Sequence, residues 1–488
     1  MSQKYKAMID ELLDQINLKN QEGLPSTSKV TVENNIGKIS VVLNKDQSAD
    51  YLLAQYDKIF MARLKDLREC FKAYLGKKKE RLTTVVEIDD RDKTNIYVFG
   101  IVNKKMKAME SYVKEVQKPE FFEINYQRKS ELFNPTDVVL LEDETGKVEL
   151  TESSKFKLDD ANLKSLGVQS LTTGCPICVY GHINEDSKFE VEKFIFLPVG
   201  SNFKTDSHHK TKLSSSILEE NGNKGKVMLI SSLKAKRENL LQSKYLQLKS
   251  FLNDQTNSLA ASVNLLAVFG GIWSALDNVN ASLFYNYNFN KNFENIREDF
   301  MLVSAYVDRL FEGYLKHPTF ESQRTLVVAP SLTDPANTFM PQAPMSQVLF
   351  KNAGKNRFMT FISNPGHAKL NNELNALFLD GLNVKDLVGQ SNINFYEAAK
   401  YILVSRVLIP TAPNTIECFP SIINDPFVIH EIPSLIIIGN SPEFKQDQLV
   451  DEDGNLVSHL IFVSDFSLTG ECVFLDLSTM ATETIIFS

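Results

Sequence analysis

The spacing of apolar residues predicts two helices near the start of the chain. Residues 1–20 carry apolar side chains at helical spacing, and residues 51–76 repeat this pattern up to Gly76. A polar segment between them, residues 21–29, predicts a loose connection. We expect the apolar face of the second helix to pack on its own domain, with docking of a partner protein as the alternative.

Short stretches of alternating apolar and polar residues follow between residue 83 and about residue 200. Turns rich in Asp, Asn, Gly and Lys separate them, and this pattern is typical of a small β-barrel of the OB-fold type. OB-folds often bind single-stranded nucleic acid, but acidic residues on these strands would repel phosphate, so protein contacts are the favoured use. The strands are expected at residues 83–88, 95–102, 137–143, 147–151, 174–183 and 189–197, and the acidic residues are Glu87, Asp89, Asp90, Glu142, Asp143 and Glu144.

A third pattern begins after residue 225, where continuous apolar strands alternate with helical segments. This pattern is typical of a layered α/β domain whose sheets are buried on both faces. The expected organisation is therefore an N-terminal helix and variable segment (1–50), a helix plus OB-fold (51–200), a polar linker (201–225) and an α/β domain (226–488). The strands of the last domain are expected at residues 227–231, 264–270, 325–330, 358–363, 376–380, 435–439 and 459–466, and its helices at 234–253, 293–316 and 394–406.

Composition and charge narrow the class of protein. The 488 residues are 43% apolar and 23% charged, which is ordinary for a globular protein, and the formal net charge is −8. A chain with this negative charge is a poor candidate for the main DNA-binding component of a complex, because sequence-independent binding depends on Lys and Arg that neutralise phosphates. Five cysteines, an N-terminus without a signal-peptide pattern and no apolar run of the about 18–20 residues that span a bilayer predict a soluble intracellular protein.

Three short motifs could carry chemistry, and each has a more ordinary explanation. Cys175 and Cys178 form a CxxC, but a structural zinc site needs four ligands and the chain has no second pair, so we expect core strand residues. His208 and His209 lie in the Ser- and Lys-rich linker, which indicates a solvated loop. The basic residues 77–79 close the second predicted helix, where cations complement the helix dipole.

Several motifs in the second half of the chain occur together in one family. Residues 409–421 read IPTAPNTIECFPS, residues 424–428 read NDPFV, and residues 435–445 read LIIIGNSPEFK. In this order and spacing they closely resemble the B-subunits of eukaryotic DNA polymerase delta. Further similar segments, such as LTTGCPICVYG at residues 171–181, extend the resemblance over about residues 51–488 and leave residues 1–50 unmatched.

The resemblance implies an OB-fold followed by a calcineurin-like phosphoesterase domain whose two-metal site has decayed. Active phosphoesterases hold two metal ions with carboxylate and imidazole ligands at strand ends. Here Ser232 stands in place of an aspartate, Lys234 in place of a histidine, and Gly271 in place of the bridging carboxylate. The other positions of the implied degenerate site are Leu332, Thr333, Asp334, Asp380, Asn440 and Pro442. We therefore expect no catalytic residue, no bound metal and no cofactor.

The family further implies a scaffold for DNA replication and repair rather than an enzyme, located in the nucleus. Its implied partners are the catalytic subunit of DNA polymerase delta, through that subunit's C-terminal cysteine-rich module, and a third subunit that reaches the sliding clamp. The catalytic subunit of the translesion polymerase zeta is a further implied partner, whereas DNA contact is expected to be weak or indirect and membrane contact absent. Candidate interface anchors are Trp273, Phe339, Phe419, Phe427 and Phe444, although burial in the core is the more ordinary explanation for each.

Two other functions stay open at this point. B-subunits of polymerases alpha and epsilon share the two-domain plan, although the motifs above are closer to the delta form. An active metal-dependent nuclease or phosphatase is the second alternative, and the lost ligands disfavour it.

Overall fold

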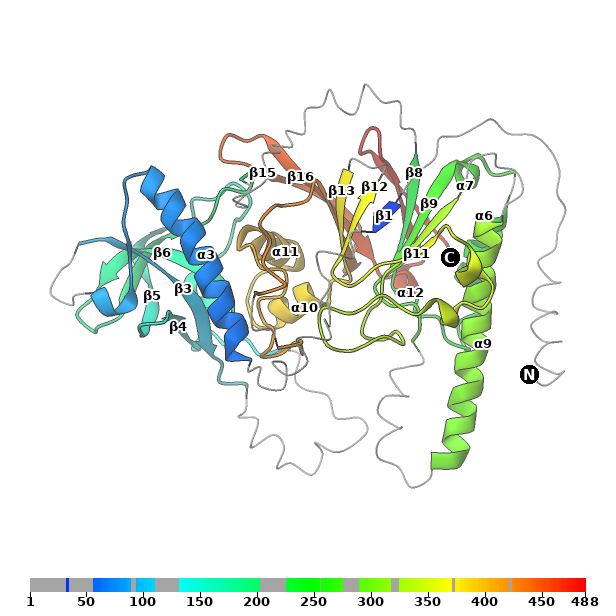
Figure 1. The fold of residues 1–488 in the computed structure, drawn as a ribbon, viewed down its shortest axis with the longest axis horizontal. Helices are drawn as coiled ribbons and strands as arrows, with labels where there is room; N and C mark the ends of the chain where they lie inside the picture. The colour runs from blue at the N-terminus through cyan, green and yellow to red at the C-terminus, as the bar shows by residue number, and fades with distance from the viewer. Residues whose placement is uncertain are drawn as a thin grey trace, which may run out of the picture.

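The computed structural model describes residues 32–34, 56–88, 94–109, 131–201, 225–254, 256–274, 289–316, 324–370, 374–420 and 424–488 (Figure 1). The helix predicted at residues 1–20, Asp89, Asp90 and most of the predicted linker, with His208 and His209, lie outside these residues. Within the described ranges, no helix combines the length and apolarity needed to cross a bilayer.

Five strands between residues 96 and 195 form a closed barrel. Their order is β3-β4-β5-β7-β6, β3 pairs with β6 to close the sheet, and the short strand β2 pairs with β3 beside the ring. Alternate residues of β5 and β7, such as Leu150 and Val191, face the core, as expected for strands with one buried face. The predicted OB-fold barrel is thus confirmed. The strands of this region are β2 (Leu82–Thr83), β3 (Ile96–Lys105), β4 (Val138–Glu142), β5 (Lys147–Lys157), β6 (Pro176–Ile183) and β7 (Phe189–Ile195).

The first predicted strand of this region, residues 83–88, is largely wrong. Only β2 is extended, and a 3-10 turn, η3 (Val85–Glu87), follows it. The Thr84 N–H donates to the side chain of Glu87 at 3.0 Å, and the Val85 N–H donates to the carboxylate of Asp143 at 3.0 Å. Because side chains satisfy these backbone groups, the segment does not need a neighbouring strand.

Helix α3 (Asp57–Lys77) packs against strands β3 and β6 of the barrel. The apolar residues whose spacing predicted the helix are buried, so its apolar face packs within its own chain. Two arginines, Arg63 and Arg68, lie buried on the same face. Arg68 pairs with Asp143 of the barrel at 3.1 Å, whereas Arg63 bonds to the second half of the chain. The buried apolar residues are Ile59, Leu64, Leu67, Phe71 and Leu75.

The second half of the chain, together with β1 from residues 32–34, forms two six-stranded sheets that pack face to face. Their orders are β11-β10-β9-β8-β17-β18 and β1-β12-β13-β14-β16-β15. Alternating side chains divide between the two faces of each sheet: Leu229 of β8 lies between the sheets, and Ile230 faces the helices outside. The rings of Phe269 and Phe378, one from each sheet, are 5.9 Å apart. The first sheet contains β8 (Lys226–Ser231), β9 (Val263–Phe269), β10 (Thr325–Val328), β11 (Met359–Phe361), β17 (Glu471–Asp476) and β18 (Thr482–Ile486), and the second contains β1 (Val32–Asn34), β12 (Gly366–Leu370), β13 (Leu374–Leu379), β14 (Leu435–Ser441), β15 (Lys445–Val450) and β16 (Leu456–Ser464).

Helices cover the outer faces of both sheets (Figure 1). The first sheet carries α6 (Ser243–Asn253), α7 (Ser258–Ser262) and α9 (Phe289–Leu315), and α12 (Phe466–Thr469) follows β16. The second sheet carries α10 (Leu382–Gly389) and α11 (Phe395–Val404), which lie between it and the barrel. These layers confirm the predicted α/β architecture. The helix predicted from residue 234 begins only at Ser243, because the side chain of Asn239 accepts the Lys236 N–H and stabilises a turn before it.

Candidate functional site

The parallel strands of both sheets end at one edge, and polar residues follow them. Strands β8, β9 and β10 are parallel in the first sheet, and β13, β14 and β16 are parallel in the second. A bridge between Ser231 and Asp465 joins the two edges. We call the following residues the strand-end cluster: Ser231, Ser232, Lys234, Gly271, Ser331, Thr333, Asp334, Asp380, Asn440 and Asp465. The assignment of seven of them as remnants of a metal site stays a prediction: Ser232, Lys234, Gly271, Thr333, Asp334, Asp380 and Asn440.

Ser232 and Asn440 bind each other in the middle of this cluster. The Ser232 hydroxyl donates to Asn440 Oδ1 at 2.6 Å, and Asn440 Nδ2 donates to the carbonyl oxygens of Gly270 and Asp380, both at 2.9 Å. Both residues are buried. The amide of Asn440 therefore uses its oxygen and both hydrogens within the protein, and it links the ends of three strands.

Two of the three carboxylates in the cluster, Asp334 and Asp380, accept hydrogen bonds from nearby loops of the chain. Asp334 Oδ1 accepts the N–H groups of Ile272 and Trp273 at 2.7 and 3.1 Å, and Asp334 Oδ2 accepts the Ser331 N–H at 2.9 Å. Asp380 accepts the Ser331 hydroxyl at 2.9 Å. Burial raises the pKa of Asp334 to about 7 and also raises the pKa of Asp380, although the hydrogen bonds they accept favour the ionised forms. These carboxylates are tied to this chain's own donors.

A lysine stands where the family resemblance places a histidine ligand. Lys234 Nζ pairs with Asp465 Oδ2 at 2.6 Å, and the Ser467 hydroxyl donates to the other oxygen of that carboxylate. A second ammonium group, on Lys385, lies in the same region: burial and the charge of Lys234 lower its pKa. Neither Asp465 nor Lys385 was predicted as a site residue, although Asp465 directly follows a continuous apolar strand, where site residues often lie.

The backbone of the cluster keeps an unusual conformation. Ser232, Lys234 and Asn440 have φ angles of 58°, 40° and 51°, a left-handed region that side-chain-bearing residues adopt at a cost of about 1–3 kcal/mol each. Gly271 has φ 109°, and a Cβ there would lie 2.6 Å from Thr333 Oγ1. A carboxylate at position 271 is therefore opposed by both the backbone and its neighbour.

These residues do not fit two divalent cations. The hydroxyl and amide groups bind one another, the buried carboxylates accept backbone N–H groups, and an ammonium group stands in the place of a ligand. Leu332 and Pro442 are exposed and make no part of the buried network. Among the described residues, no group of three or more His, Cys, Asp and Glu side chains is placed to hold a metal ion.

A second polar site lies at the junction between the barrel and the α/β half. Arg63 of α3 is fully buried, and its Nε donates to Asp425 Oδ2 at 2.6 Å. Its Nη1 donates to the carbonyl oxygens of Gly174 and Pro410 at 2.6 and 3.0 Å. Gly174 has φ 86°, and a Cβ there would lie 1.8 Å from the Pro410 oxygen, so only glycine fits this close approach. One arginine thus joins the helix, a barrel loop and the α/β half.

Other buried charges of the junction also bond across it. Arg406, which follows α11, donates from Nη2 to the carbonyl oxygens of Val199 and Ser201 at 3.0 and 3.2 Å, and burial lowers its pKa to about 10. Lys104 of β3 donates to the Gln390 carbonyl oxygen at 2.9 Å, and burial lowers its pKa to about 8. Each of these cations lies in one half and bonds to the backbone of the other.

Apolar packing across the junction is continuous. One buried cluster contains barrel residues such as Phe99 and Phe189 together with Tyr401 of α11 and Phe462 of β16. The barrel therefore shares its core with the second sheet and with helices α10 and α11. We use the word junction below for this shared core and the charged residues that bond across it.

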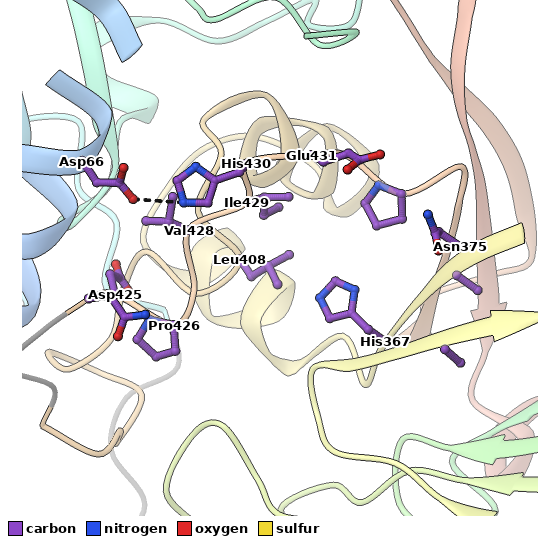
Figure 2. A pocket seen from close by; sticks show the side chains of 14 residues that line it. Asp66, His367, Asn375, Leu408, Asp425, Pro426, Val428, Ile429, His430 and Glu431 are labelled. Atoms are coloured by element: carbon purple, nitrogen blue, oxygen red, sulfur yellow. Dashed lines mark ion pairs between the residues drawn. The ribbon is translucent and has the colours of Figure 1, made fainter. Parts of the chain in front are cut away.

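A cavity of about 330 Å³ lies beside the junction, between α3, strands β12 and β13, and the loop of residues 424–433 (Figure 2). Asp66 of α3 pairs with His430 of that loop, with Oδ2 and Nε2 3.1 Å apart. His367 of β12 lies on another wall of the cavity. The ion pair adds one more connection between the two halves when His430 is protonated.

The candidate interface anchors fall into two groups. Trp273 and Phe427 are 0% and 1% exposed, so each is part of this chain's own core, which is the explanation that the sequence favoured for all five candidates. Phe339 and Phe419 are 36% and 37% exposed, and their ring centroids are 5.4 Å apart. Phe444 is half-buried against the core between the sheets. Phe339, Phe419 and Phe444 therefore stay candidate interface anchors.

The CxxC cysteines are core residues, as expected. Cys175 and Cys178 are both fully buried, and burial raises the pKa of each thiol. Thr172 Oγ1 lies 3.2 Å from Cys175 Sγ. Thiols with raised pKa values are poor metal ligands and poor nucleophiles, so this pair serves packing.

Two family models match the chain, the first over the barrel region and the second over the α/β half. The DNA polymerase delta subunit OB-fold domain matches residues 55–194, which contain α3 and the barrel. The DNA polymerase alpha/epsilon B-subunit family matches residues 227–446, which contain most of the α/β half and the strand-end cluster up to Asn440.

Two plant relatives match this chain along nearly their whole length, and an insect relative matches over part of its length. A rice protein, the DNA polymerase delta small subunit, is 24% identical over 91% of this chain and 95% of its own length. The Arabidopsis thaliana DNA polymerase delta small subunit is 26% identical over 91% of this chain and 93% of its own length. The Drosophila melanogaster DNA polymerase delta subunit 2 is 30% identical over 33% of this chain and 37% of its own length. The chain is thus similar to DNA polymerase delta small subunits over about nine tenths of its length, with an OB-fold match followed by a B-subunit match.

Proposed function

We propose that this chain is a subunit of DNA polymerase delta and acts as a non-catalytic scaffold in DNA replication and repair. It would hold the catalytic subunit, through that subunit's C-terminal cysteine-rich module, and a third subunit that reaches the sliding clamp. The same surface would serve the catalytic subunit of polymerase zeta in translesion synthesis. Its place of action would be the nucleus, which imaging of the tagged chain in its native cell can test.

The observation that carries this proposal is the way in which the strand-end cluster is bonded. Hydrolysis by a phosphoesterase needs two metal ions that stabilise the attacking and leaving oxygens. Here Asn440, Asp334 and Asp380 bind this chain's own donors and acceptors, and Lys234 adds a positive charge. What remains is a large body suited to protein contacts.

The junction gives independent support to the scaffold proposal. A scaffold must keep two docking surfaces at a fixed distance, and a shared core with buried charges across it restricts movement between them. Families of B-subunits that serve other polymerases share the second family model, so the partner is the feature that experiment must identify.

Reconstitution with one subunit left out tests the proposal. The catalytic and third subunits of the polymerase are co-expressed with and without this chain, and the complexes are sized by chromatography with light scattering. We expect a three-subunit complex with the chain and no association of the other two without it. Association of those two subunits in its absence would contradict the bridging role.

The nuclease alternative has its own test. The purified chain is incubated with manganese and single-stranded DNA, beside the Asp334→Ala variant. We expect no turnover by either protein above the background of a mock purification. Turnover that is lost in the variant would show an active metal site and would overturn the proposal.

A further inference from the structure

A groove of about 740 Å³ opens where the barrel, the end of α3 and the β15–β16 turn meet. Tyr74 of α3 donates its hydroxyl to Glu452 of the β15–β16 turn at 2.8 Å, which joins two walls of the groove. Tyr97 of β3 and Tyr180 of β6 line the barrel side. We call this feature the tyrosine groove.

The floor of the tyrosine groove is aromatic and half-buried. The rings of Tyr97 and Tyr180 have centroids 4.7 Å apart and are tilted by 43°. Tyr74 and Tyr97, with Leu158, Ile195 and Phe196, are partly buried residues that pack on the shared core and line the groove. Aromatic groups held in a concave site within a polar rim are typical of the centre of a protein interface.

One lysine of the groove is bonded to a tyrosine hydroxyl. Lys78 Nζ donates to the Tyr74 hydroxyl at 2.5 Å, so the ammonium group lies beside the oxygen, 4.3 Å from the ring centroid. An ammonium or guanidinium group placed over the face of a tyrosine ring is attracted by its negative charge distribution. Tyr97 and Tyr180 offer the same kind of face without such a cation among the described residues.

The rim of the groove is more negative than positive. Asp159, Asp160, Asp451 and Glu452 line it, against two lysines, Lys78 and Lys193. Burial raises the pKa of Asp160, and the negative charges of Asp159 and Glu452 add to this rise. A rim with this charge repels the phosphates of nucleic acid and attracts a basic protein segment.

We infer that the tyrosine groove binds a segment of a partner protein of the polymerase that places an arginine or lysine on the Tyr97–Tyr180 pair, with the acidic rim around it. This inference rests on the proposed scaffold function and adds the chemistry of one contact. Each tyrosine supplies rigid contact area, and the carboxylates supply the charge that selects the partner.

Charge reversal on the rim tests the inference in the full chain. The probes are the catalytic subunit and the third subunit, each titrated against wild-type chain and against Asp159→Lys/Glu452→Lys. The matched control is Glu238→Lys/Glu483→Lys, which reverses two exposed carboxylates of the α/β half. Thermal unfolding checks that every variant is folded.

We expect the groove variant to bind one of the two subunits about tenfold or more weakly, with a smaller salt dependence, and the control to bind both within about twofold. A Tyr180→Ala variant should weaken binding of that same partner about fivefold or more, because it removes the aromatic face. If the wild-type chain binds and the groove variants bind both subunits equally well, the inference fails and the scaffold function stands. If the wild-type chain binds neither subunit, both fail.

Discussion

The strand-end cluster and the junction are both polar and buried, but their hydrogen bonds run in different directions. In the cluster, Asn440 and Asp334 bond to loops of the same α/β half. In the junction, Arg63 and Arg406 bond from one half of the molecule to the other. The bonds of the cluster occupy the polar groups that a metal site would need free, whereas the bonds of the junction hold the barrel and the α/β half together. The direction of the hydrogen bonds therefore says more about the role of a buried polar group than its burial does.

The largest effect should come from the buried ion pair of the junction. Replacing Arg63 by Met leaves Asp425 buried without its cation and two carbonyl oxygens without a donor. We expect a loss of about 3–5 kcal/mol in the free energy of unfolding, measured by denaturant titration. The control is Arg81→Met, whose 82%-exposed side chain pairs with Glu87 and should contribute about 0–1 kcal/mol.

A double variant separates charge from shape at the same place. Arg63→Met/Asp425→Leu removes both charges, so we expect it to regain part of the stability that the single variant loses. A single variant as stable as wild type would show that the junction does not depend on this pair, and the comparison with the cluster would lose its basis.

The next largest effect should be a pH dependence of the free energy of unfolding that arises from Asp334 in the strand-end cluster. The folded pKa of Asp334 is about 7, above its ordinary value of 3.8, so the folded chain holds this proton more tightly than the unfolded chain. Its contribution to stability is present at low pH and is lost as pH rises from about 4 to about 7, by up to about 4 kcal/mol. We expect the stability of wild type relative to Asp334→Asn to fall over this range in denaturant titrations. A constant difference would contradict the raised pKa.

A smaller effect should mark the tight packing around Gly271. Gly271→Ala places a methyl group 2.6 Å from Thr333 Oγ1 at φ 109°, whereas Gly454→Ala meets a similar φ of 81° with no heavy atom within 4 Å. We expect the first variant to lose about 1–2 kcal/mol more than the second, because the strain is shared and only the contact differs. Equal losses would mean that the cluster has room for a side chain there.

The smallest effect on stability is expected at the exposed aromatic pair. Phe339→Ser and Phe419→Ser should each change the free energy of unfolding by less than about 1 kcal/mol, because both rings are partly in water. If these rings are anchors, the same variants weaken binding of the catalytic or third subunit, while Val348→Ser, at an 83%-exposed position, does not. Unchanged affinities would remove both residues from the candidate anchors.

The sequence pattern predicted the parts of the fold that local periodicity controls. Continuous apolar strands such as β9 and β14 and the helix α3 were predicted because their burial follows from neighbours in sequence. The edge strands β15, with the sequence KQDQLV, and β18 were not predicted, because edge strands carry little apolar signal. Strands β12 and β17 lie inside their sheets and were also missed, although β17 contains the buried apolar run CVFL.

The residues of the candidate site also fall into those that the sequence predicted and those that it could not. Family motifs placed Ser232, Asp334, Asp380 and Asn440 at strand ends, and the structure brings them into one hydrogen-bonded cluster. The junction could not be predicted, because Arg63 and Asp425 are 362 positions apart and no local pattern connects them. The only signal was an arginine on the apolar face of a predicted helix, which is unusual for a residue that is seldom fully buried without a partner.

Manganese binding to the purified full chain tests the central claim most directly. Equilibrium dialysis at neutral pH, with wild type beside Asp380→Ala, counts the ions held per chain. We expect no tightly held ion in wild type and no difference between the two proteins, because the cluster's polar groups already bind one another. Two ions per chain that are lost in the variant would contradict the account.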